Sequence, residues 1–296
     1  MTAIHVVSHM DDQQRRAHIF AGDFIVFRQL DAMNALCAWT QALARDAFGG
    51  RDPMRAQADM DTESYLAVVA PLQRRFTTDP ECRRLYRDAL AEAGLDVGKS
   101  YWDWRLLRFQ PRADLHVSRS TTGLRCHRDT WYGCAMAQNN WWAPVFPIDG
   151  DRTVVFYPAY WQRPIANNTE GWDLDDYRAA RNKATAANAS FEELRKSYRE
   201  PTVTEPVDEV GGVRFVIEPG DLLCFSSAHL HASVPNSTSL ARISTEIRTI
   251  NPTDILTGQG APNVDTRTIY KSAVDFRSID GDHPLTDALV AMPALL

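Results

Sequence analysis

Apolar residues follow two different periods along this chain, and the change falls near residue 100. Before it they recur three and four positions apart, as Tyr65, Val69 and Leu72 do, which is the period of an α-helix with one buried face. After it they fall in short runs separated by turn residues, a pattern typical of β-strands. The expected helices cover residues 31–47, 65–76 and 80–93, after one early strand at 24–28.

Short runs between residues 101 and 250 have the composition of β-strands. They cover residues 104–109, 115–118, 138–145, 153–157, 213–217, 221–225 and 242–250. Several short strands with turns between them predict a sandwich or a jelly roll. The expected fold class is therefore mainly β with flanking helices.

The length and composition of the chain predict a single domain over 1–296, because 296 residues with 44% hydrophobic content suffice for one large core. We expect three parts: a helix-rich buttress at 1–100, a β core at 101–250 and a C-terminal extension at 251–296. A polar insert at about 166–208 interrupts the β pattern and predicts helices over 174–187 and 190–198. The insert is either a lid or a solvated excursion between two strands.

Charge, hydropathy and cysteine content exclude several classes of protein. The net charge of −6 and the pI near 5.8, without a local cluster of basic residues, argue against a nucleic-acid partner. No apolar run approaches the roughly 20 residues that cross a bilayer, so we expect no membrane partner and a cytoplasmic location. The five cysteines include no Cys-x-x-Cys pair, so neither a disulfide framework nor a zinc knuckle is expected.

Two histidines and one aspartate carry the chemistry that the sequence predicts. In an extended segment alternate side chains share a face, so His127 and Asp129 reach the same point. A His-x-Asp pair alone is common and is usually a surface or hydrogen-bonded pair. With the distal His231 it forms the set that holds a non-haem Fe(II) while leaving positions open for a co-substrate and O2. His229, two residues earlier, is the alternative distal ligand.

The strand that follows the distal histidine presents a basic and a hydroxyl side chain to one face. Arg242 and Ser244 share one parity, whereas Ile243 and Thr245 face the other layer. A guanidinium suits bidentate recognition of a carboxylate. In isolation Arg242 would be interpreted as an exposed or salt-bridged arginine, but its register with His231 favours a binding site for a dicarboxylic acid.

Taken together, these motifs resemble the Fe(II)/2-oxoglutarate-dependent oxygenases, and among them the phytanoyl-CoA dioxygenase-like branch. The resemblance runs from Trp104 to Ile250. The matching elements are His127-Arg-Asp129, Pro219-Gly-Asp221 with Phe225, and the block from His231 through Pro235-Asn236 to Arg242-Ile-Ser244. The block matches only when it is aligned on His231, which favours this residue over His229.

The resemblance implies a fold and an activity. The fold is a double-stranded β-helix, a cupin-like jelly roll with the metal site at one open end. The metal is Fe(II), held by His127, Asp129 and His231, and the co-substrate is 2-oxoglutarate, with its far carboxylate on Arg242 and Ser244. The activity is that of a dioxygenase that uses O2, hydroxylates an aliphatic carbon of a small molecule and releases succinate and CO2.

Aromatic residues crowd between positions 131 and 161, and core packing explains most of them. Those closest to the triad in sequence or predicted strand position are candidates for substrate contact, as are two arginines that suit an anionic substrate. These substrate candidates are Trp131, Trp142, Arg105 and Arg108. Two amides, Asn140 and Gln138, are candidates for donating to 2-oxoglutarate. Each of these residues also has an ordinary packing or surface explanation.

One segment departs from the family pattern: many members carry a Pro-Gly-Ser-His loop where this chain has Tyr157-Pro-Ala-Tyr-Trp161. The acyl-CoA specificity of the family name therefore does not transfer, and we expect a small metabolite or biosynthetic intermediate as substrate. Two other classes remain open. One is a protein or peptide hydroxylase with an open groove, and the other is a non-catalytic cupin-like sensor that binds metal.

Overall fold

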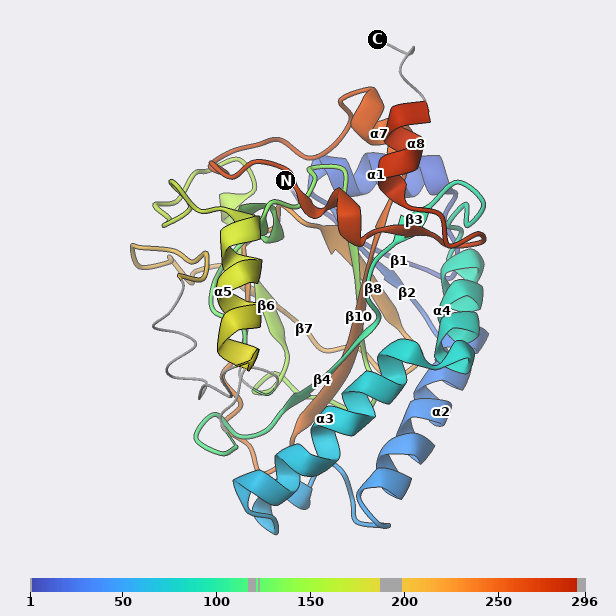
Figure 1. Ribbon diagram of the computed structural model, residues 1–296, viewed down its shortest axis with the longest axis vertical. Helices are drawn as coiled ribbons and strands as arrows, with labels where there is room; N and C mark the ends of the chain where they lie inside the picture. The colour runs from blue at the N-terminus through green and yellow to red at the C-terminus, as the bar shows by residue number, and fades with distance from the viewer. Residues whose placement is uncertain (1, 117–120, 122, 187–198, 292–296) are drawn as a thin grey trace.

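The computed structural model describes residues 2–116, 121, 123–186 and 199–291, and within them the strands form two sheets (Figure 1). The larger sheet contains β1 (Ile4–Val7), β2 (Phe24–Phe27), β3 (Tyr101–Trp102), β4 (Leu106–Gln110), β5 (Asn139–Pro144), β8 (Leu222–Ser226), β10 (Arg242–Ile250) and β11 (Arg277–Ser278). Its order is β1-β2-β8-β5-β10-β3-β11, and β4 also pairs with β10. The smaller sheet has the order β7-β6-β9, with β6 (Val154–Phe156), β7 (Val213–Phe215) and β9 (His231–Ser233).

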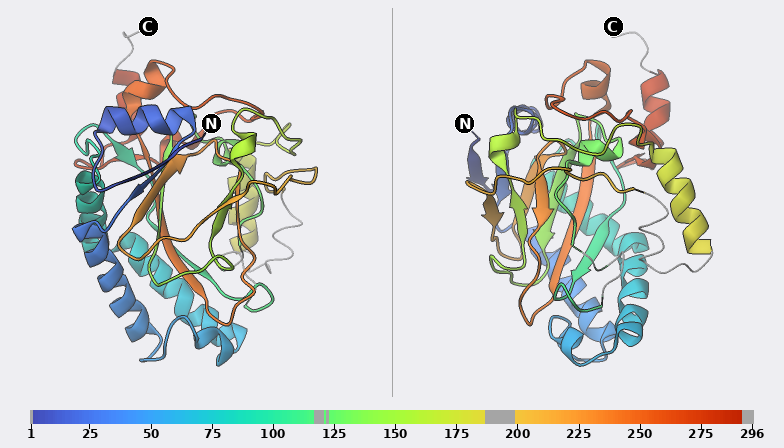
Figure 2. Two further views of the ribbon diagram at one scale, coloured as in Figure 1. Left: turned by 180° about the vertical axis from the view of Figure 1, so that it is seen from behind. Right: turned by 90° about the vertical axis from the view of Figure 1, so that its left-hand side faces the viewer.

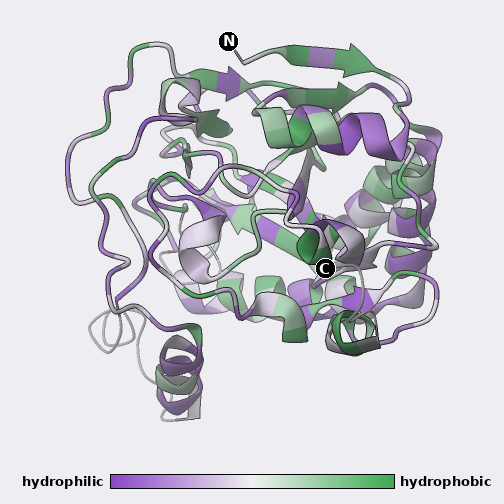
Figure 3. Ribbon diagram, turned by 90° about the horizontal axis from the view of Figure 1, so that it is seen from above, coloured by the Kyte–Doolittle hydropathy of each residue, from purple (hydrophilic) through white to green (hydrophobic). Residues whose placement is uncertain are grey.

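The central strands of the larger sheet are buried on both faces, because helices cover one face and the smaller sheet covers the other. In β2, Ile25 and Phe27 pack into the cluster shared with the helices, whereas Phe24 and Val26 pack against the smaller sheet. The same alternation runs through β5 and β8. Seen from above, the N-terminal strands are largely hydrophobic (Figure 3). Because side chains alternate between the two faces of each strand, every second side chain of β5 and β10 faces the space between the two sheets.

Three helices form the outer layer: α2 (Asp31–Ala47), α3 (Thr62–Thr78) and α4 (Pro80–Glu92). They lie together on one side of the molecule (Figure 2). Asp79 accepts a hydrogen bond from the Glu81 N–H and precedes Pro80 at the first helical position, which defines the start of α4. Glu92 at the end of α4 accepts from the first N–H groups of α2, so the two helices are joined at their ends.

The predicted mainly β core with flanking helices is confirmed, and so are the helices expected in the first hundred residues. That region also extends the sheet, which the sequence did not predict: β1 pairs with β2 in parallel, and α1 (Asp12–Ala21) connects the two strands. The strand expected at 115–118 is wrong where the structure describes it, because Leu115 and His116 lie in a bend; residues 117–118 lie outside the described residues. The jelly-roll connectivity stays a prediction.

The insert contains α5 (Leu174–Ala186), which confirms the first of its two expected helices; the second, at 190–198, lies outside the described residues. In Figure 1, α5 lies across the molecule from α2 and α4. The C-terminal part forms α7 (Pro252–Leu256), the 3-10 turn η4 (Ser272–Asp275) and α8 (Leu285–Ala291). Among the described helices, none has both the length and the apolar character that crossing a bilayer requires.

Candidate metal centre

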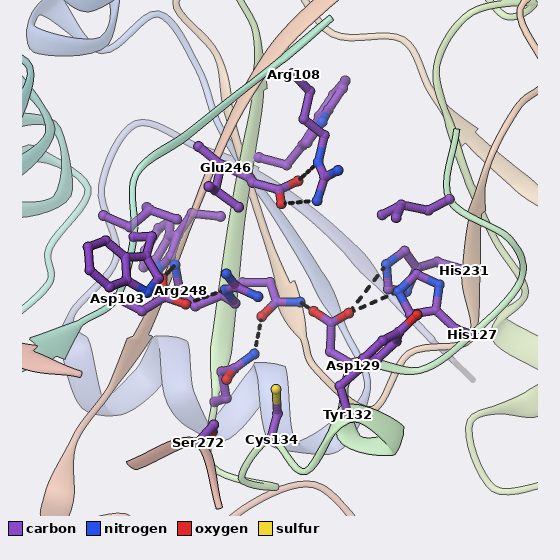
Figure 4. Close-up of a pocket in the computed structure, with 18 of the residues that line it drawn as sticks. Asp103, Arg108, His127, Asp129, Tyr132, Cys134, His231, Glu246, Arg248 and Ser272 are labelled. Atoms are coloured by element: carbon purple, nitrogen blue, oxygen red, sulfur yellow. Dashed lines mark hydrogen bonds and ion pairs between the residues drawn. The ribbon is translucent and has the colours of Figure 1, made fainter. Parts of the chain in front are cut away.

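Two imidazoles and one carboxylate converge between the two sheets (Figure 4). Nε2 of His127 lies 3.1 Å from Oδ1 of Asp129, and Nε2 of His231 lies 4.0 Å from the same oxygen. One possible ligand atom from each residue lies within 4.8 Å of the others. A metal with ligands at about 2.1 Å and right angles between them separates neighbouring ligand atoms by roughly 3 Å. The three groups therefore surround a space of the size of one ion.

Backbone pairing places the two histidines opposite each other. The His127 N–H donates to the His231 carbonyl at 3.0 Å, and the His231 N–H donates to the His127 carbonyl at 2.9 Å. Residues that exchange both hydrogen bonds in an antiparallel pair present their side chains to the same face. Arg128 is extended, and Asp129 then begins the 3-10 turn η2 (Asp129–Tyr132), so its carboxylate returns to the side of His127.

Hydrogen bonds fix which nitrogen of each imidazole faces the centre. Nδ1 of His127 lies 2.7 Å from the Arg125 carbonyl, and Nδ1 of His231 lies 2.9 Å from the His229 carbonyl. A carbonyl only accepts, so Nδ1 carries a proton in both rings, and Nε2 is the nitrogen through which each ring can bind a metal. Burial, with the nearby charge of His127, lowers the pKa of His231 to about 4 and keeps its ring neutral at neutral pH.

The carboxylate is held by two amide side chains, Asn140 on β5 and Gln138 just before it. Nδ2 of Asn140 donates to Oδ2 of Asp129 at 2.5 Å, and Nε2 of Gln138 donates to Oδ1 of Asn140 at 2.8 Å. Burial acts to raise the pKa of Asp129, but the hydrogen bond between Nε2 of His127 and this carboxylate, together with its electrostatic interaction with the two histidines, outweighs burial and holds that pKa below its usual range. The carboxylate stays ionised with Oδ1 turned toward the histidines.

His229, the alternative distal ligand, lies outside this centre. Its Nε2 lies 3.1 Å from the Gly22 carbonyl, and its Nδ1 accepts from the Ser226 N–H at 3.1 Å. The ring stacks on Phe24 with centroids 4.2 Å apart. Both nitrogens are thus engaged in packing the chain, and the structure places His231 beside Asp129 instead.

Arg242 lies on the wall of the same space with part of its hydrogen-bonding capacity unused. One terminal nitrogen donates to the Thr153 carbonyl at 2.9 Å, the other lies 3.4 Å from Oγ of Ser233, and Nε has no hydrogen-bond partner among the described residues. Burial, together with the charge of Arg108, lowers the pKa of Arg242 to about 9. A buried cation that faces a cavity without a carboxylate partner is stabilised by an anionic ligand.

Two further buried polar atoms on this face have no partner among the described residues: Nε1 of Trp142 and Oγ of Ser244. Trp142 of β5 lines the cavity together with Arg242 of β10. Ser244, also on β10, is fully buried and is not part of the cavity lining. The predicted parity of β10 is confirmed, because Ile243 packs into the helix-facing cluster and Thr245 bonds to Tyr86 behind the sheet. The Arg242 side of the strand therefore faces the site.

The centre opens into a cavity of about 430 Å³. Its walls carry three ion pairs, Arg108–Glu246, Arg248–Asp103 and Arg178–Asp275. The first joins β4 to β10, the second joins the β3–β4 connection to β10, and the third joins α5 of the insert to the end of η4. Tyr177 and Arg181 of α5 line the cavity as well. The insert thus covers part of the site.

Two of the predicted substrate contacts do not reach the cavity. The indole N–H of Trp131 donates to Asp265 at 2.8 Å, and its ring is fully buried in a separate apolar cluster. Arg105 donates to the Thr77 carbonyl at 2.8 Å and stacks over Trp102. The 3-10 turn after Asp129 is the reason for the first correction, because it rotates Trp131 away from the face that an extended strand would give it. Arg108, Trp142, Gln138 and Asn140 do line the cavity.

Several cavity residues were not predicted from the sequence. Glu246 and Arg248 share the parity of Arg242 on β10, and that spacing was a sufficient signal. No sequence pattern marked Asp103, or Ser272, Asp275 and Phe276 of the C-terminal part, because only the folded chain brings them there.

The residues present fit a divalent metal with an anionic co-substrate. Two imidazoles that direct Nε2 at one ionised carboxylate are the donor set that non-haem Fe(II) takes in oxygenases. Arg242 lines the same cavity wall and has no carboxylate partner among the described residues, so its cation is available to an anionic ligand. The centre therefore has the donors, spacing and protonation to bind a metal through three protein ligands and leave its remaining positions to small molecules.

No protein-family model matches the chain, and no curated protein sequence does. Among solved structures, EvdO2 from Micromonospora carbonacea var. aurantiaca, complexed with 2-oxoglutarate, is 13% identical with a TM-score of 0.46, over 82% of this chain and 92% of that one. The epimerase SnoN, in complex with Fe3+, alpha-ketoglutarate and nogalamycin RO, is 15% identical with a TM-score of 0.43, over 82% and 86%. The non-haem monooxygenase ThoJ is 15% identical with a TM-score of 0.39, over 72% and 70%.

Proposed function

We propose that this protein is an Fe(II)- and 2-oxoglutarate-dependent dioxygenase that hydroxylates an aliphatic carbon of a small metabolite or biosynthetic intermediate. The observation that carries the proposal is the convergence of His127, Asp129 and His231, with Nε2 of both histidines facing one carboxylate oxygen. The placement in the phytanoyl-CoA dioxygenase-like branch, with its jelly-roll connectivity, depends on the sequence motifs.

In this function the three residues of the triad hold Fe(II). With 2-oxoglutarate and O2, the bound metal supplies an oxidant able to hydroxylate an unactivated C–H bond, and succinate and CO2 are released. Asn140 holds Oδ2 of Asp129, which keeps Oδ1 directed at the metal. Arg242 binds the far carboxylate of 2-oxoglutarate through its guanidinium, which has no carboxylate partner among the described residues, and Trp142 lies on the same wall. Gln138 and Asn140, which line the cavity, stay candidates for contacts to the co-substrate, whereas the predicted contact of Ser244 is not supported because this side chain is fully buried behind the lining.

The charges on the cavity wall indicate which kind of substrate fits it. Arg108 is already neutralised by Glu246 through two hydrogen bonds of 2.8 and 2.6 Å, so it does not present a free positive charge to an anionic substrate. The other two cavity ion pairs are balanced in the same way. This wall suits a polar molecule with little net charge, such as one rich in hydroxyl groups. Because α5 covers part of the cavity, we propose that the insert acts as a lid, which favours a small molecule over a protein substrate.

The first experiment tests the metal and co-substrate site without any knowledge of the substrate. Under anaerobic conditions, Fe(II) and 2-oxoglutarate added to the purified protein give the weak visible charge-transfer band of their chelate, and Asp129→Ala or His231→Ala weakens it. His229→Gln is the matched control and retains the band, because this histidine is engaged elsewhere. Absence of the band in the iron-loaded wild-type protein would overturn the proposal.

The second experiment separates an enzyme from a metal-binding sensor. A screen of succinate release over a library of small metabolites, with short peptides as a second arm, reports coupled turnover. We expect a small molecule to stimulate succinate release. Stimulation by peptides alone would establish a peptide hydroxylase, and iron and 2-oxoglutarate binding without turnover in either arm would favour the sensor.

A further inference from the structure

A second cluster of metal-binding residue types lies outside the cavity. His5 is in β1, His18 is in the last turn of α1, and Asp23 directly precedes β2. Nε2 of His5 and Nδ1 of His18 each lie 2.9 Å from Oδ2 of Asp23, and the two rings have centroids 4.1 Å apart. One possible ligand atom from each residue lies within 4.8 Å of the others. None of the three lines the cavity.

The local fold fixes this arrangement. Gly22 ends α1 with φ of 94°, a left-handed conformation that glycine adopts without strain. The turn brings Asp23 back over the helix end, where its N–H donates to the His18 carbonyl at 3.0 Å. Parallel pairing of β1 with β2 sets His5 level with Ile25, next to the same turn. The three side chains therefore meet where the strand-helix-strand crossover closes.

A backbone hydrogen bond orients the carboxylate of Asp23 toward the two imidazoles. The Ala3 N–H donates to Oδ1 of Asp23 at 2.8 Å, which leaves Oδ2 to face both imidazoles. The C-terminal end of α1 also points its partial negative charge at the cluster. The oriented carboxylate and the helix end both stabilise a cation here.

We propose that His5, His18 and Asp23 form a second metal site, separate from the cavity, that binds Zn²⁺ and clips β1, α1 and β2 together. Imidazole and carboxylate are ordinary zinc ligands, and around a tetrahedral Zn²⁺ with bonds of about 2.0–2.1 Å they lie roughly 3.4 Å apart. Each imidazole nitrogen therefore needs to move away from Oδ2 of Asp23 by only about half an ångström. The side chains are 28%, 31% and 14% exposed, so they can adjust and water can take the remaining position.

The test is a zinc titration of the full-length protein by equilibrium dialysis with metal analysis. Wild type binds two zinc ions per chain, one at each cluster, because zinc also fits the triad. His18→Ala and Asp23→Asn each bind one, and Asp129→Ala also binds one, which is the zinc at the new site. His9→Ala binds two; this histidine is exposed near the same end of the chain and hydrogen-bonds the Glu92 carbonyl, away from the cluster, so it is the matched control.

A stability measurement provides a second readout of the same site. In the Asp129→Ala background, zinc raises Tm because it binds the folded chain, and the added His18→Ala substitution removes the shift. The proposal is overturned if His18→Ala and Asp23→Asn bind as much zinc as wild type. It does not rest on the proposed enzyme: if the triad binds no metal, wild type binds one zinc that His18→Ala loses and Asp129→Ala retains.

Discussion

Asn140 donates a hydrogen bond to Oδ2 of Asp129 at 2.5 Å, while Oδ1 of the same carboxylate faces Nε2 of both histidines. The two oxygens of Asp129 thus have different tasks. Oδ2 is anchored to β5 by Asn140, and Oδ1 is available to a metal. Gln138 holds the amide of Asn140 in turn, so the orientation of the carboxylate is set by the sheet.

Replacement of Asn140 by Ala is expected to weaken metal binding. Without the amide, Asp129 can rotate, and loss of a group that orients a metal ligand typically costs about 10- to 100-fold in affinity. Anaerobic titration with Fe(II) measures the change. Asn139→Ala is the control, because the Asn139 side chain donates to the Ala137 carbonyl on the other face of the strand. An unchanged affinity in Asn140→Ala would show that the amide does not position the carboxylate.

Much of this centre was accessible from the sequence because strand parity is a local property. The spacing of Arg242 and Ser244 predicted which face of β10 looks inward, and the block after His231 distinguished it from His229. Those inferences needed only a strand with two different faces. The helices α2 to α4 were predicted for a similar reason, since one apolar stripe at helical spacing defines each of them.

What the sequence did not predict depends on turns and on distant segments. Trp131 was expected beside the metal, but a single 3-10 turn changes the side to which it points. Asp103 and Asp275 reach the cavity from segments that lie far apart in the chain, and neither lies in a recognisable motif. The role of Asn140 also required the fold, because its contact with Asp129 joins two elements at a distance that no periodicity encodes.

Replacement of Arg242 by Ala is expected to raise the Kd for 2-oxoglutarate by about 10- to 100-fold, since a hydrogen bond to a charged group contributes about 1.5–3 kcal/mol. Iron binding should change little, because the guanidinium has no contact with the triad among the described residues. Titration of the charge-transfer band with 2-oxoglutarate measures the Kd. Arg214→Ala, at an exposed arginine on β7, is the control. Equal Kd values in Arg242→Ala and wild type would reject the assignment.

Trp131→Phe is expected to lower stability without changing the site. The substitution removes the indole hydrogen bond to Asp265 and keeps most of the apolar packing, so the free energy of unfolding should fall by about 1 kcal/mol. Urea unfolding measures the loss, and the Kd for Fe(II) and for 2-oxoglutarate should match those of wild type. Trp142→Phe is the comparison, because Trp142 lines the cavity and its loss should weaken 2-oxoglutarate binding. A higher Kd for Fe(II) or 2-oxoglutarate in Trp131→Phe would instead show that Trp131 contributes to the site.

His229 is expected to make the protein sensitive to acid. Burial lowers its pKa to about 3 in the folded state, although hydrogen bonds with Gly22 and Ser226 partly oppose this, whereas an unfolded histidine titrates near 6.5. Between these values the unfolded chain binds a proton that the folded chain does not. The contribution of His229 to stability is therefore full above about pH 6.5 and is lost as the pH falls toward 3.

The His229→Gln variant isolates this effect, because it removes the titrating group and keeps a polar side chain. One proton corresponds to about 1.4 kcal/mol of unfolding free energy per pH unit, so the decline of stability between pH 6 and 4 should be shallower by up to that amount in the variant. Urea unfolding at several pH values gives both slopes. His283→Gln, at an exposed histidine, should retain the wild-type slope. Since His231 is present in all three proteins, a slope that is the same in His229→Gln and wild type would assign the acid sensitivity to other groups.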